Sequence, residues 1–365
     1  MNHQNIRIVQ LIDSLEIGGA ERMAVNYANG LVVIIGFSAL ITTRKEGLLK
    51  KALHPDVDFL FLNKRKKIDL QAIFKMVSYL KKNNITHIHA HSSSFFLALI
   101  AKVFMPSVKI IWHDHYGNSD YLNQRRSWIL KIGSLGFDRI IAVNRKLELW
   151  AKTKLYCSQV CYLSNFVAVS DFGNPIKLFG NSGKRIVCSA NLRPQKNHFF
   201  LLEVALLVKK KYPQWSFHLI GVDKDDSYSK SVKQQIKDLH LEQQVFIYGA
   251  VENVKAVLSD CQIGILTSKS EGLPLALLEY GCCQLPVVVT AVGQIPDFID
   301  EGLGSCVDKE DVSVFFEKIE ELIGNSDLRE KIGAKFKLKV EDDFGVNMTL
   351  KKYIGFIKNG NNYNS

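Results

Sequence analysis

The sequence lacks a hydrophobic run long enough to cross a membrane. A membrane-spanning helix needs about 18 to 20 mostly apolar residues. The longest candidate, residues 31–41 (LVVIIGFSALI), is shorter and is interrupted by Gly36 and Ser38. Residues 1–13 (MNHQNIRIVQLID) contain no apolar segment of the kind found in secretion signals and are typical of a β-strand. We therefore expect the protein to be made and kept in the cytosol.

A cysteine pattern that would indicate disulfides is also missing. The seven cysteines are odd in number and irregular in spacing, which favours reduced, mostly buried thiols. There is no low-complexity tract and no clear internal repeat. With 365 residues, of which 47% are hydrophobic, the chain has the length and composition of about two globular domains.

Acidic residues are scarce in the first half only. Residues 1–175 contain 23 Lys and Arg against 12 Asp and Glu, whereas residues 176–365 contain 24 of each, so the net charge of +11 lies in the first half. The charge is densest in residues 63–84, which suit a solvated surface helix. The asymmetry between the halves nevertheless indicates an anionic partner, such as a membrane surface, a phosphorylated acceptor or nucleic acid. Nucleic acid is disfavoured because there is no basic stripe interleaved with aromatic residues.

Buried strand-like runs alternate with helical stretches along the whole chain. In the first half, strands are predicted at 6–13, 36–43, 57–63, 86–92, 109–115, 139–144 and 160–165, and helices at 19–31, 69–83, 95–104 and 145–154. In the second half, strands are predicted at 185–192, 215–222, 245–250, 263–268 and 286–290, and helices at 197–212, 228–241, 254–261 and 273–283. Because the strands do not alternate apolar with polar residues, the pattern predicts parallel sheets covered on both faces.

The fold class expected from this pattern is α/β, with two doubly wound, Rossmann-like domains that face each other across a cleft. We place the first domain at residues 1–175 and the second at residues 176–340. Residues 341–365 are expected to form a helix that packs back on the first domain. Ligands of doubly wound sheets bind beyond the carboxyl ends of the strands, so the cleft is the expected site.

The loop DSLEIGGAER (13–22) follows a predicted strand and opens a helix. Gly18 and Gly19 would let backbone N–H groups approach an anion at the helix start. A plain turn into a helix explains them equally well. The spacing is not G-x-G-x-x-G, so a dinucleotide site is only weakly indicated.

The segment SANLRPQKNHF (189–199) also joins a strand to a helix. It places two cations, Arg193 and Lys196, at the helix start, where the helix dipole disfavours positive charge. A bound anion, for example a diphosphate, would remove that penalty. Two solvated cations are the alternative.

Histidines gather at two predicted strand ends, in THIHAHS and WHDHYG. Alternate residues of a strand share one face, so several of these rings could converge. Metal binding is one interpretation, but no Cys or Glu partner at metal-site spacing is present, and a hydrogen-bonding or acid–base role fits as well. We expect no metal site and favour a function for His113 alone, at the mouth of the predicted cleft. The other histidines of the two segments are His87, His89, His91 and His115.

Two glutamates frame the segment SEGLPLALLE (270–279). Glu271 lies in the predicted loop, and Glu279 lies between one and two turns into the predicted helix, which Ser268 or Ser270 would cap. A carboxylate at that depth can accept hydrogen bonds from both hydroxyls of a ribose. The N–H groups at the helix start can face an anion, and a nucleotide-sugar site needs both features. Those N–H groups belong to Gly272, Leu273 and Leu275.

With these motifs in this order, the sequence resembles the family 4 glycosyltransferases. They are retaining enzymes of the GT-B fold, of the kind used in bacterial surface polysaccharide assembly. The resemblance covers nearly the whole chain. It rests on GGAER (18–22), WHDHYG (112–117), LSN (163–165), LRPQKN (192–197) and SEGLPLALLEYGCCQLPVVVT (270–290). The last segment contains the E-x7-E element of the family.

The resemblance implies a role for each motif. Glu279 would hold the nucleotide ribose, and Glu271 would meet the donor sugar and phosphates together with the segment that follows it, Gly272, Leu273, Pro274 and Leu275. The diphosphate would be neutralised by Arg193 and Lys196, the donor sugar would contact His113, and Gly18 and Gly19 would line the cleft. The sequence departs from the family in three respects. The usual arginine lies five residues before the lysine, whereas Arg193 lies three before it. Asp297 stands where a glutamate is common, and residues 28–41 are shorter than the usual helix, loop and strand.

The working hypothesis is transfer of a hexosyl or N-acetylhexosaminyl group, with retention, from a nucleoside diphosphate sugar. A UDP-sugar is favoured as donor and a glycan or lipid-linked glycan as acceptor, in surface polysaccharide or glycolipid synthesis. Fixed cations can stabilise the leaving diphosphate, so no metal cofactor is expected, and we interpret DKDD (223–226) as a polar loop. The protein would act in the cytoplasm, at the inner face of the membrane if the basic half binds anionic lipid.

Two other functions remain open at this stage. A nucleotide-sugar epimerase of the same fold would convert the donor without an acceptor. A non-catalytic protein that binds an anion or nucleic acid would explain the positive charge of the first half, but it would not explain Glu271 and Glu279.

Overall fold

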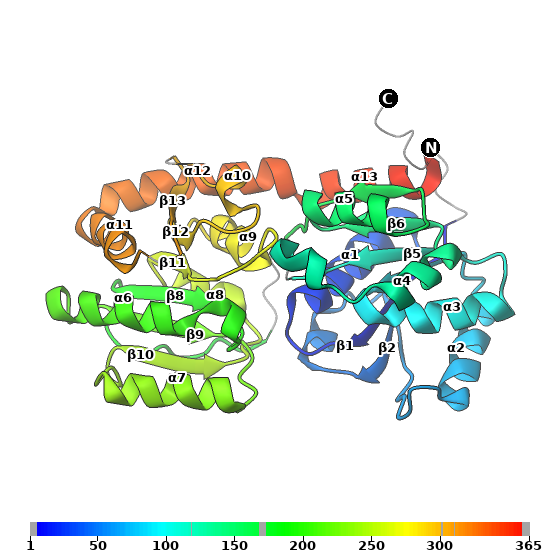
Figure 1. Cartoon of the computed structure of the whole chain (residues 1–365), viewed down its shortest axis with the longest axis horizontal. Helices are drawn as coiled ribbons and strands as arrows, with labels where there is room; N and C mark the ends of the chain where they lie inside the picture. Colours follow the sequence, from blue (N-terminus) through cyan, green and yellow to red (C-terminus); the bar gives the residue numbers. More distant parts are fainter. Residues whose placement is uncertain (1–5, 118, 168–172, 301, 310, 360–365) are drawn as a thin grey trace. The chain divides into compact units, whose positions relative to one another are not determined.

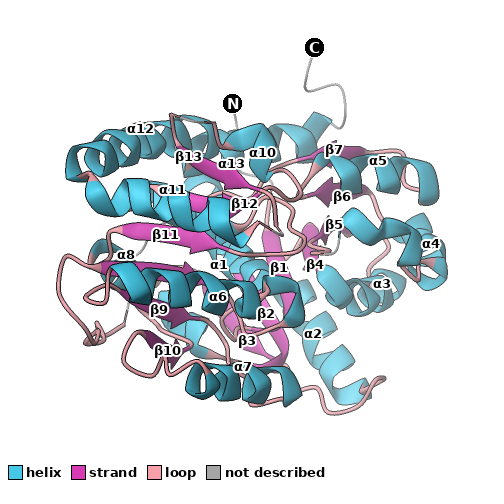
Figure 2. Cartoon of the chain, turned by 60° about the vertical axis from the view of Figure 1, so that its left-hand side comes forward, coloured by secondary structure: helices cyan, strands magenta, loops and turns pink. Residues whose placement is uncertain are grey.

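The computed structural model describes residues 6–117, 119–167, 173–300, 302–309 and 311–359. The chain divides into two compact units, which we call unit 1 (Met1–Ala168 with Val346–Ser365) and unit 2 (Val169–Gly345). Figures 1 and 2 show that each unit is a sheet between helices. Residues 168–172, shortly before the expected domain boundary at 175/176, lie outside the described residues.

Unit 1 is built on a seven-stranded parallel sheet in the order β3-β2-β1-β4-β5-β6-β7. Its strands are β1 (Ile8–Ser14), β2 (Ser38–Lys45), β3 (Asp58–Phe61), β4 (His87–His91), β5 (Lys109–Asp114), β6 (Arg139–Ala142) and β7 (Val160–Tyr162). Its helices are α1 (Gly19–Ile35), α2 (Leu70–Lys82), α3 (Phe95–Phe104), α4 (Trp128–Gly133), α5 (Arg145–Lys154) and α13 (Val346–Asn359). The strand order reverses direction between β1 and β4, which makes a topological switch point.

Unit 2 repeats the plan with a six-stranded parallel sheet in the order β10-β9-β8-β11-β12-β13. Its strands are β8 (Arg185–Ser189), β9 (Ser216–Ile220), β10 (Val245–Gly249), β11 (Ile263–Leu266), β12 (Val287–Thr290) and β13 (Gly304–Val307). Its helices are α6 (His198–Lys211), α7 (Ser227–Asp238), α8 (Val254–Ser259), α9 (Leu275–Cys282), α10 (Ile295–Phe298), α11 (Val312–Gly324) and α12 (Ser326–Phe344). Here the switch point lies between β8 and β11.

The two faces of the unit 1 sheet differ in character. One face packs apolar residues, such as Ile88 and Trp112, against α2 and α3. The opposite face carries buried polar residues and is covered by α1 and α13, which pack on each other. A Cβ atom at Gly30 of α1 would lie 2.3 Å from Leu350 Cδ1 of α13, so this glycine permits the close approach of the two helices.

Helix α1 is longer than the sequence predicts. It continues through Val32 to Ile35 instead of ending at residue 31, and it stops at Gly36, whose φ is +75°. β-branched residues lower helix propensity only by a fraction of about 1 kcal/mol each, and burying Leu31 and Val32 outweighs that. A left-handed glycine then ends the helix in the usual way. The short strand β13 was also missed.

Two other expectations from composition can be compared with the structure. All seven cysteines carry free thiols, as expected. Within the described ranges, none of the helices combines the length and the apolar character that membrane crossing requires.

Two buried histidines of unit 2 are held neutral by their surroundings. His218 on β9 lies 2.9 Å from Ser216 Oγ and 3.0 Å from Tyr248 OH. Burial, with a smaller contribution from Arg185, lowers its pKa to about 4. Burial and then the charge of Lys196 likewise lower the pKa of His198 to about 4.

These histidines predict a loss of stability in mild acid. As the pH falls below 6.5, the unfolded chain binds protons that the folded chain does not. Each histidine should therefore cost up to about 1.4 kcal/mol of unfolding free energy per pH unit between pH 6.5 and 4. Urea unfolding at pH 7.5 and 5.0 measures the loss, which should be smaller in His218→Gln. The exposed-histidine control, His240→Gln, should match the wild type, and an equal loss in His218→Gln would contradict the assignment.

Candidate active site

Two loops of unit 2 meet at its topological switch point, one after β8 and one after β11. The Lys269 N–H donates to the Gln195 carbonyl (2.8 Å), and the Gln195 side-chain amide donates to the Ser270 carbonyl (2.7 Å). The Thr267 hydroxyl donates to the Lys196 carbonyl (3.0 Å). Both backbone and side chains thus join the loops at the place where doubly wound sheets bind ligands.

An ion pair lies at the centre of this junction. The Lys196 ammonium donates to Glu271 Oε1, and the Ser268 hydroxyl donates to the same oxygen (2.6 Å). Glu271 is buried, with 6% of its surface exposed. Breaking a buried pair by removing one partner typically costs about 3 to 5 kcal/mol, because the other charge is left uncompensated. The structure therefore brings together two residues that the sequence assigned to the site from segments far apart.

A third loop, which follows β12, supports the Glu271 segment from behind. Gly293 has a φ of +61°, and a Cβ atom there would lie 1.9 Å from the Glu271 carbonyl oxygen. The neighbouring Gln294 N–H donates to the Gly272 carbonyl (3.2 Å), and the Thr290 hydroxyl donates to the Ser268 carbonyl (2.7 Å). Only glycine fits between these backbones.

Helix α9 begins later than predicted and has a different cap. Its N-cap is Pro274, in extended geometry and without a side-chain cap. Neither Ser268 nor Ser270 caps it, because the Ser268 hydroxyl bonds to Glu271. Leu273 and Leu275 are buried beside this start, and Glu279 is half-buried one turn into the helix.

The buried residue next to Glu279 fixes the helix on the sheet. The Tyr280 hydroxyl accepts from the Ser189 N–H (2.6 Å) at the end of β8. It also lies 3.1 Å from the Ile265 carbonyl of β11, to which it donates. Tyr280 thereby holds α9, and with it Glu279, at a fixed height above the carboxyl ends of both strands.

Arg193 stands at the start of the 3-10 turn Pro194–Lys196. It is exposed, and its carbonyl accepts from the Lys196 N–H (2.9 Å). Among the residues that the structure describes, its side chain makes no hydrogen bond or ion pair. Arg193 and Lys196 therefore share one turn, with the first side chain available to an anion and the second already paired.

The DKDD segment is used for local structure. Asp223 pairs with Lys233 (2.7 Å), and Asp226 caps α7 by accepting from the Ser229 N–H (3.0 Å). These contacts agree with its interpretation as a polar loop.

In unit 1, the two glycines lie at the start of α1, after β1. Gly18 is the N-cap, with an extended backbone, and Gly19 is exposed. A Cβ atom at Gly18 would lie 2.3 Å from a carboxylate oxygen of Glu21. The lining of a cleft by these glycines stays a prediction.

His113 lies deeper than the sequence suggests. Its side chain is 0% exposed, and its Nδ1 lies 3.1 Å from Nε2 of His89. The reason is register, because His113 points from β5 to the polar face of the sheet under α1. Its contact with a donor sugar stays a prediction. His115, just past the strand, lines a cavity of about 430 Å³ within unit 1 together with Tyr116 and Arg125.

Sequence reasoning missed the residues that hold the site in place. Gln195, Ser268 and Thr267 act through hydrogen bonds between loops that no local pattern reveals. Tyr280 follows Glu279 directly in the chain, but its contact with β8 depends on the tertiary fold. Gly293 offered a signal, since a lone glycine just after a buried strand often marks a tight turn.

Two protein-family models match the chain one after the other. The model described as Glycosyltransferase Family 4 matches residues 17–169, and the model described as Glycosyl transferases group 1 matches residues 174–338. The chain belongs to the family 4 glycosyltransferases. The matches cover most of unit 1 and most of unit 2, so membership does not rest on one motif.

The chain is similar to a poly(ribitol-phosphate) α-N-acetylglucosaminyltransferase of Staphylococcus aureus. The two are 24% identical over 66% of this chain and 48% of that protein. The chain thus spans about half the length of this relative. An Escherichia coli UDP-Gal:α-D-GlcNAc-diphosphoundecaprenol α-1,3-galactosyltransferase is 22% identical over 80% of this chain and 76% of that protein.

Among solved structures, Anabaena HepE in complex with UDP and glucose is similar, with a TM-score of 0.80, 16% identity, and coverage of 97% of this chain and 100% of that one. The GT-B fold expected from the sequence is confirmed. The relatives named here are transferases, and the comparisons give no support to the epimerase alternative.

The tight packing of Gly293 predicts a specific defect. Gly293→Ala should push the Glu271 backbone away and lower donor turnover strongly, in addition to the cost of about 1 to 2 kcal/mol for alanine at a left-handed φ. Gly183→Ala is the matched control, since Gly183 has a φ of +79° and open space around its Cβ position. Gly183→Ala should lose only the cost of the left-handed φ in thermal unfolding and should keep its turnover, whereas Gly293→Ala should lose more stability and also lose turnover. Equal turnover in the two would contradict the role of this packing.

Proposed function

We propose that the protein transfers a sugar, with retention, from a UDP-sugar to a glycan or lipid-linked glycan acceptor in surface polysaccharide or glycolipid synthesis. The transferred group would be a hexosyl or N-acetylhexosaminyl residue. The observation that carries the proposal is the junction of the two switch-point loops, where Lys196 and Glu271 are paired beside the exposed Arg193.

The chemistry of that junction suits a diphosphate leaving group. Breaking the bond between the sugar and the diphosphate places negative charge on the phosphate oxygens. Donors and cations fixed in advance stabilise such charge without reorganising. Arg193 would bind the diphosphate directly, and Lys196 would share its ammonium between Glu271 and a phosphate. In this proposal no metal cofactor is needed for the transfer.

The remaining roles follow the family pattern. Glu279, fixed by the neighbouring Tyr280, would accept hydrogen bonds from the ribose hydroxyls. Glu271 and the segment from Gly272 to Leu275 would meet the donor sugar and phosphates. No carboxylate is proposed as a covalent nucleophile, because Glu271 is engaged by Lys196 and Ser268.

Arg193 offers the cleanest test, because its removal breaks no buried pair. Arg193→Ala should reduce UDP release from a panel of UDP-sugars, with bacterial lipid extract as acceptor, by roughly 10²- to 10³-fold, the usual effect of losing one charge-stabilising donor. Its unfolding free energy should stay at the wild-type value. Lys210→Ala, which removes an exposed cation of α6, should retain full turnover.

Near-normal turnover in Arg193→Ala would overturn the assignment of the diphosphate site. If every UDP-sugar is consumed equally with and without the lipid extract, transfer to a lipid-linked acceptor is contradicted.

A membrane surface is the second partner in this proposal. The observation that supports it is the apolar surface of helices α2, α3 and α4 in unit 1. Large apolar side chains of three consecutive helices are exposed where α2 packs on α3 and α3 packs on α4. The rings of Phe74 and Phe104 lie 6.1 Å apart. The exposed residues on these helices are Leu70, Phe74, Phe96, Val103, Phe104, Trp128, Ile129 and Ile132.

Basic residues flank this apolar surface. Arg65, Lys66 and Lys67 are exposed just before α2. Amphipathic helices with Lys or Arg beside Trp, Phe and Leu lie in the interface of anionic bilayers. In unit 2, by contrast, the described residues include only three large exposed apolar side chains, Phe179, Val314 and Leu338. We therefore place the protein at the cytoplasmic face of the membrane, with unit 1 in contact.

Liposome flotation tests the membrane surface. The wild type should float with vesicles that contain anionic lipid and much less with neutral vesicles. Phe74→Ser combined with Phe104→Ser should weaken binding by at least about 10-fold, because each buried Phe contributes about 1.5 to 3 kcal/mol. Leu338→Ser, an equally exposed apolar position of unit 2, should bind like the wild type. Equal, negligible flotation with both vesicle types would argue for a soluble acceptor.

A further inference from the structure

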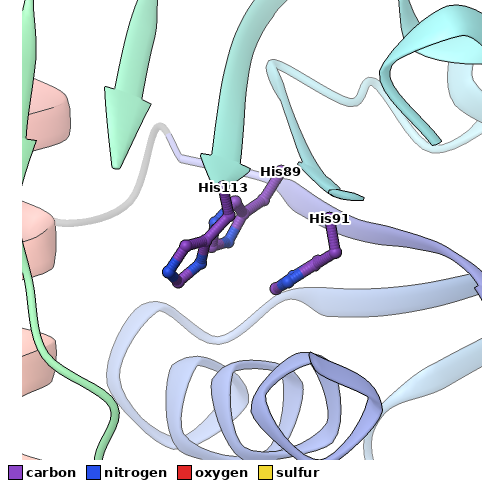
Figure 3. A group of neighbouring side chains, drawn as sticks. All are labelled: His89, His91 and His113. Atoms are coloured by element: carbon purple, nitrogen blue, oxygen red, sulfur yellow. The ribbon is translucent and has the colours of Figure 1, made fainter. Parts of the chain in front are cut away.

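The polar face of the unit 1 sheet brings three histidines together. His89 and His91 are alternate residues of β4, and His113 pairs in register with His91 on β5. Figure 3 shows the three rings on the same side of the two strands, directed toward one another. Each side chain is at most 1% exposed. Nothing in the donor site of unit 2 accounts for this cluster.

The ring nitrogens are close enough for a shared metal ion. One nitrogen from each of the three rings lies within 4.8 Å of the others. The shortest separation, 3.1 Å, joins His89 Nε2 and His113 Nδ1. Two nitrogens on a tetrahedral zinc ion, each bound at about 2.0 to 2.1 Å, stand about 3.3 Å apart. Small side-chain rotations would therefore bring one nitrogen of each ring to a distance at which all three can bind the same zinc ion.

Buried polar atoms without partners gather around the same three rings. Within the described residues, His89 Nδ1 and His113 Nε2 have no hydrogen-bond partner. The same holds for the hydroxyls of Tyr27 on α1 and Tyr353 on α13 and for the side-chain nitrogen of Gln10 on β1. Buried polar groups are rarely left unpaired, since each costs about 1 to 3 kcal/mol. The cluster therefore has the polar surroundings of a site for a ligand.

The protonation state also suits metal binding. Neutral imidazole is the form of histidine that binds a metal ion, and it is the dominant form of an ordinary histidine at neutral pH. His91 Nε2 lies 3.0 Å from Gln10 Oε1, an oxygen that accepts a hydrogen bond from a protonated Nε2. His91 Nδ1 lies 2.9 Å from His115 Nε2, so a metal ion at Nδ1 would replace the contact with His115, and the Gln10 oxygen on the outer nitrogen is a usual support for a ligating histidine.

We propose that His89, His91 and His113 bind a divalent first-row transition-metal cation, Zn²⁺ before others, inside unit 1. Three imidazoles without thiolate or carboxylate suit zinc or its neighbours and are unsuited to Mg²⁺ or Ca²⁺, which prefer oxygen ligands. The ion ties β4 to β5 under the α1–α13 layer. This proposal differs from our expectation of no metal, which rested on the absence of a Cys or Glu partner.

The proposal is separate from the catalysis proposed above. The transfer proposed for unit 2 requires no ion. The tests below therefore measure metal, and none of them uses turnover.

Metal analysis of the full chain, purified without a histidine tag, tests the site. Elemental analysis should find about one zinc per chain. Chelator treatment should lower the thermal unfolding temperature, and one equivalent of Zn²⁺ should restore it. Co²⁺ added to the chelated protein should give the visible absorption of a tetrahedral nitrogen site. Absence of stoichiometric metal together with no response to Zn²⁺ or Co²⁺ would overturn the proposal.

Graded variants separate ligation from general destabilisation. His91→Gln should lose stoichiometric metal. Gln10→Leu, which removes the outer support alone, should weaken zinc binding by roughly 10- to 100-fold. His218→Gln, a buried histidine of unit 2, should bind zinc like the wild type. If His91→Gln does not fold, the response of the wild type to the chelator and to added Zn²⁺ tests the site instead. Equal zinc content in all three variants would contradict the site.

Discussion

The Lys196–Glu271 ion pair is the interaction on which the candidate active site depends. It joins loops separated by more than 70 residues of chain, and the hydrogen bonds of Gln195, Thr267 and Ser268 all converge on the same junction. A buried carboxylate is costly without a cation. The conformation of the loop after β11, which buries Glu271, therefore depends on the loop after β8, which places Lys196 beside it. The close packing of Gly293 then leaves the Glu271 backbone no alternative position.

Unit 1 places buried polar groups on one face of its parallel sheet, whereas unit 2 places them in the loops that follow two of its strands. In unit 2, the Lys196 ammonium compensates the charge of the Glu271 carboxylate, and Arg193 is exposed next to the same turn. Unit 1 keeps its histidines neutral by burial, with Gln10 and His115 as hydrogen-bond partners of His91. A doubly wound sheet normally fills both faces with aliphatic residues. Polar residues in such positions are retained when they bind or position something, and both polar regions lie near switch points.

The sequence predicted the fold, because alternating strand and helix runs are local patterns that identify the two sheets. The spacing of Glu271 and Glu279 likewise indicated a loop and a helix start, which the structure has at the unit 2 switch point, while the roles of these two residues stay predictions. The extension of α1 through Val32 to Ile35 was not predictable from propensity, since the burial of Val32 and Ile35 in the fold favours it.

The supports of the site escaped prediction for a similar reason. Ser268 looked like a helix cap in the sequence, whereas its hydroxyl bonds to Glu271 in the fold. The depth of His113 follows from strand register, which fixes the face a residue points to but cannot be read from a single strand. Residues that act through contacts distant in sequence are visible only in the structure.

In the proposed mechanism, the unit 2 switch point binds uridine diphosphate through the cations Arg193 and Lys196 and through Glu279. Calorimetric titration of UDP into the wild type, Glu279→Gln and the exposed-glutamate control Glu203→Gln measures this directly. We predict saturable UDP binding to the wild type and to Glu203→Gln. Binding to Glu279→Gln should be roughly 10- to 100-fold weaker, as expected when a hydrogen bond to a charged group worth about 1.5 to 3 kcal/mol is lost. Undiminished binding to Glu279→Gln, or no binding of UDP to the wild type, would contradict the account.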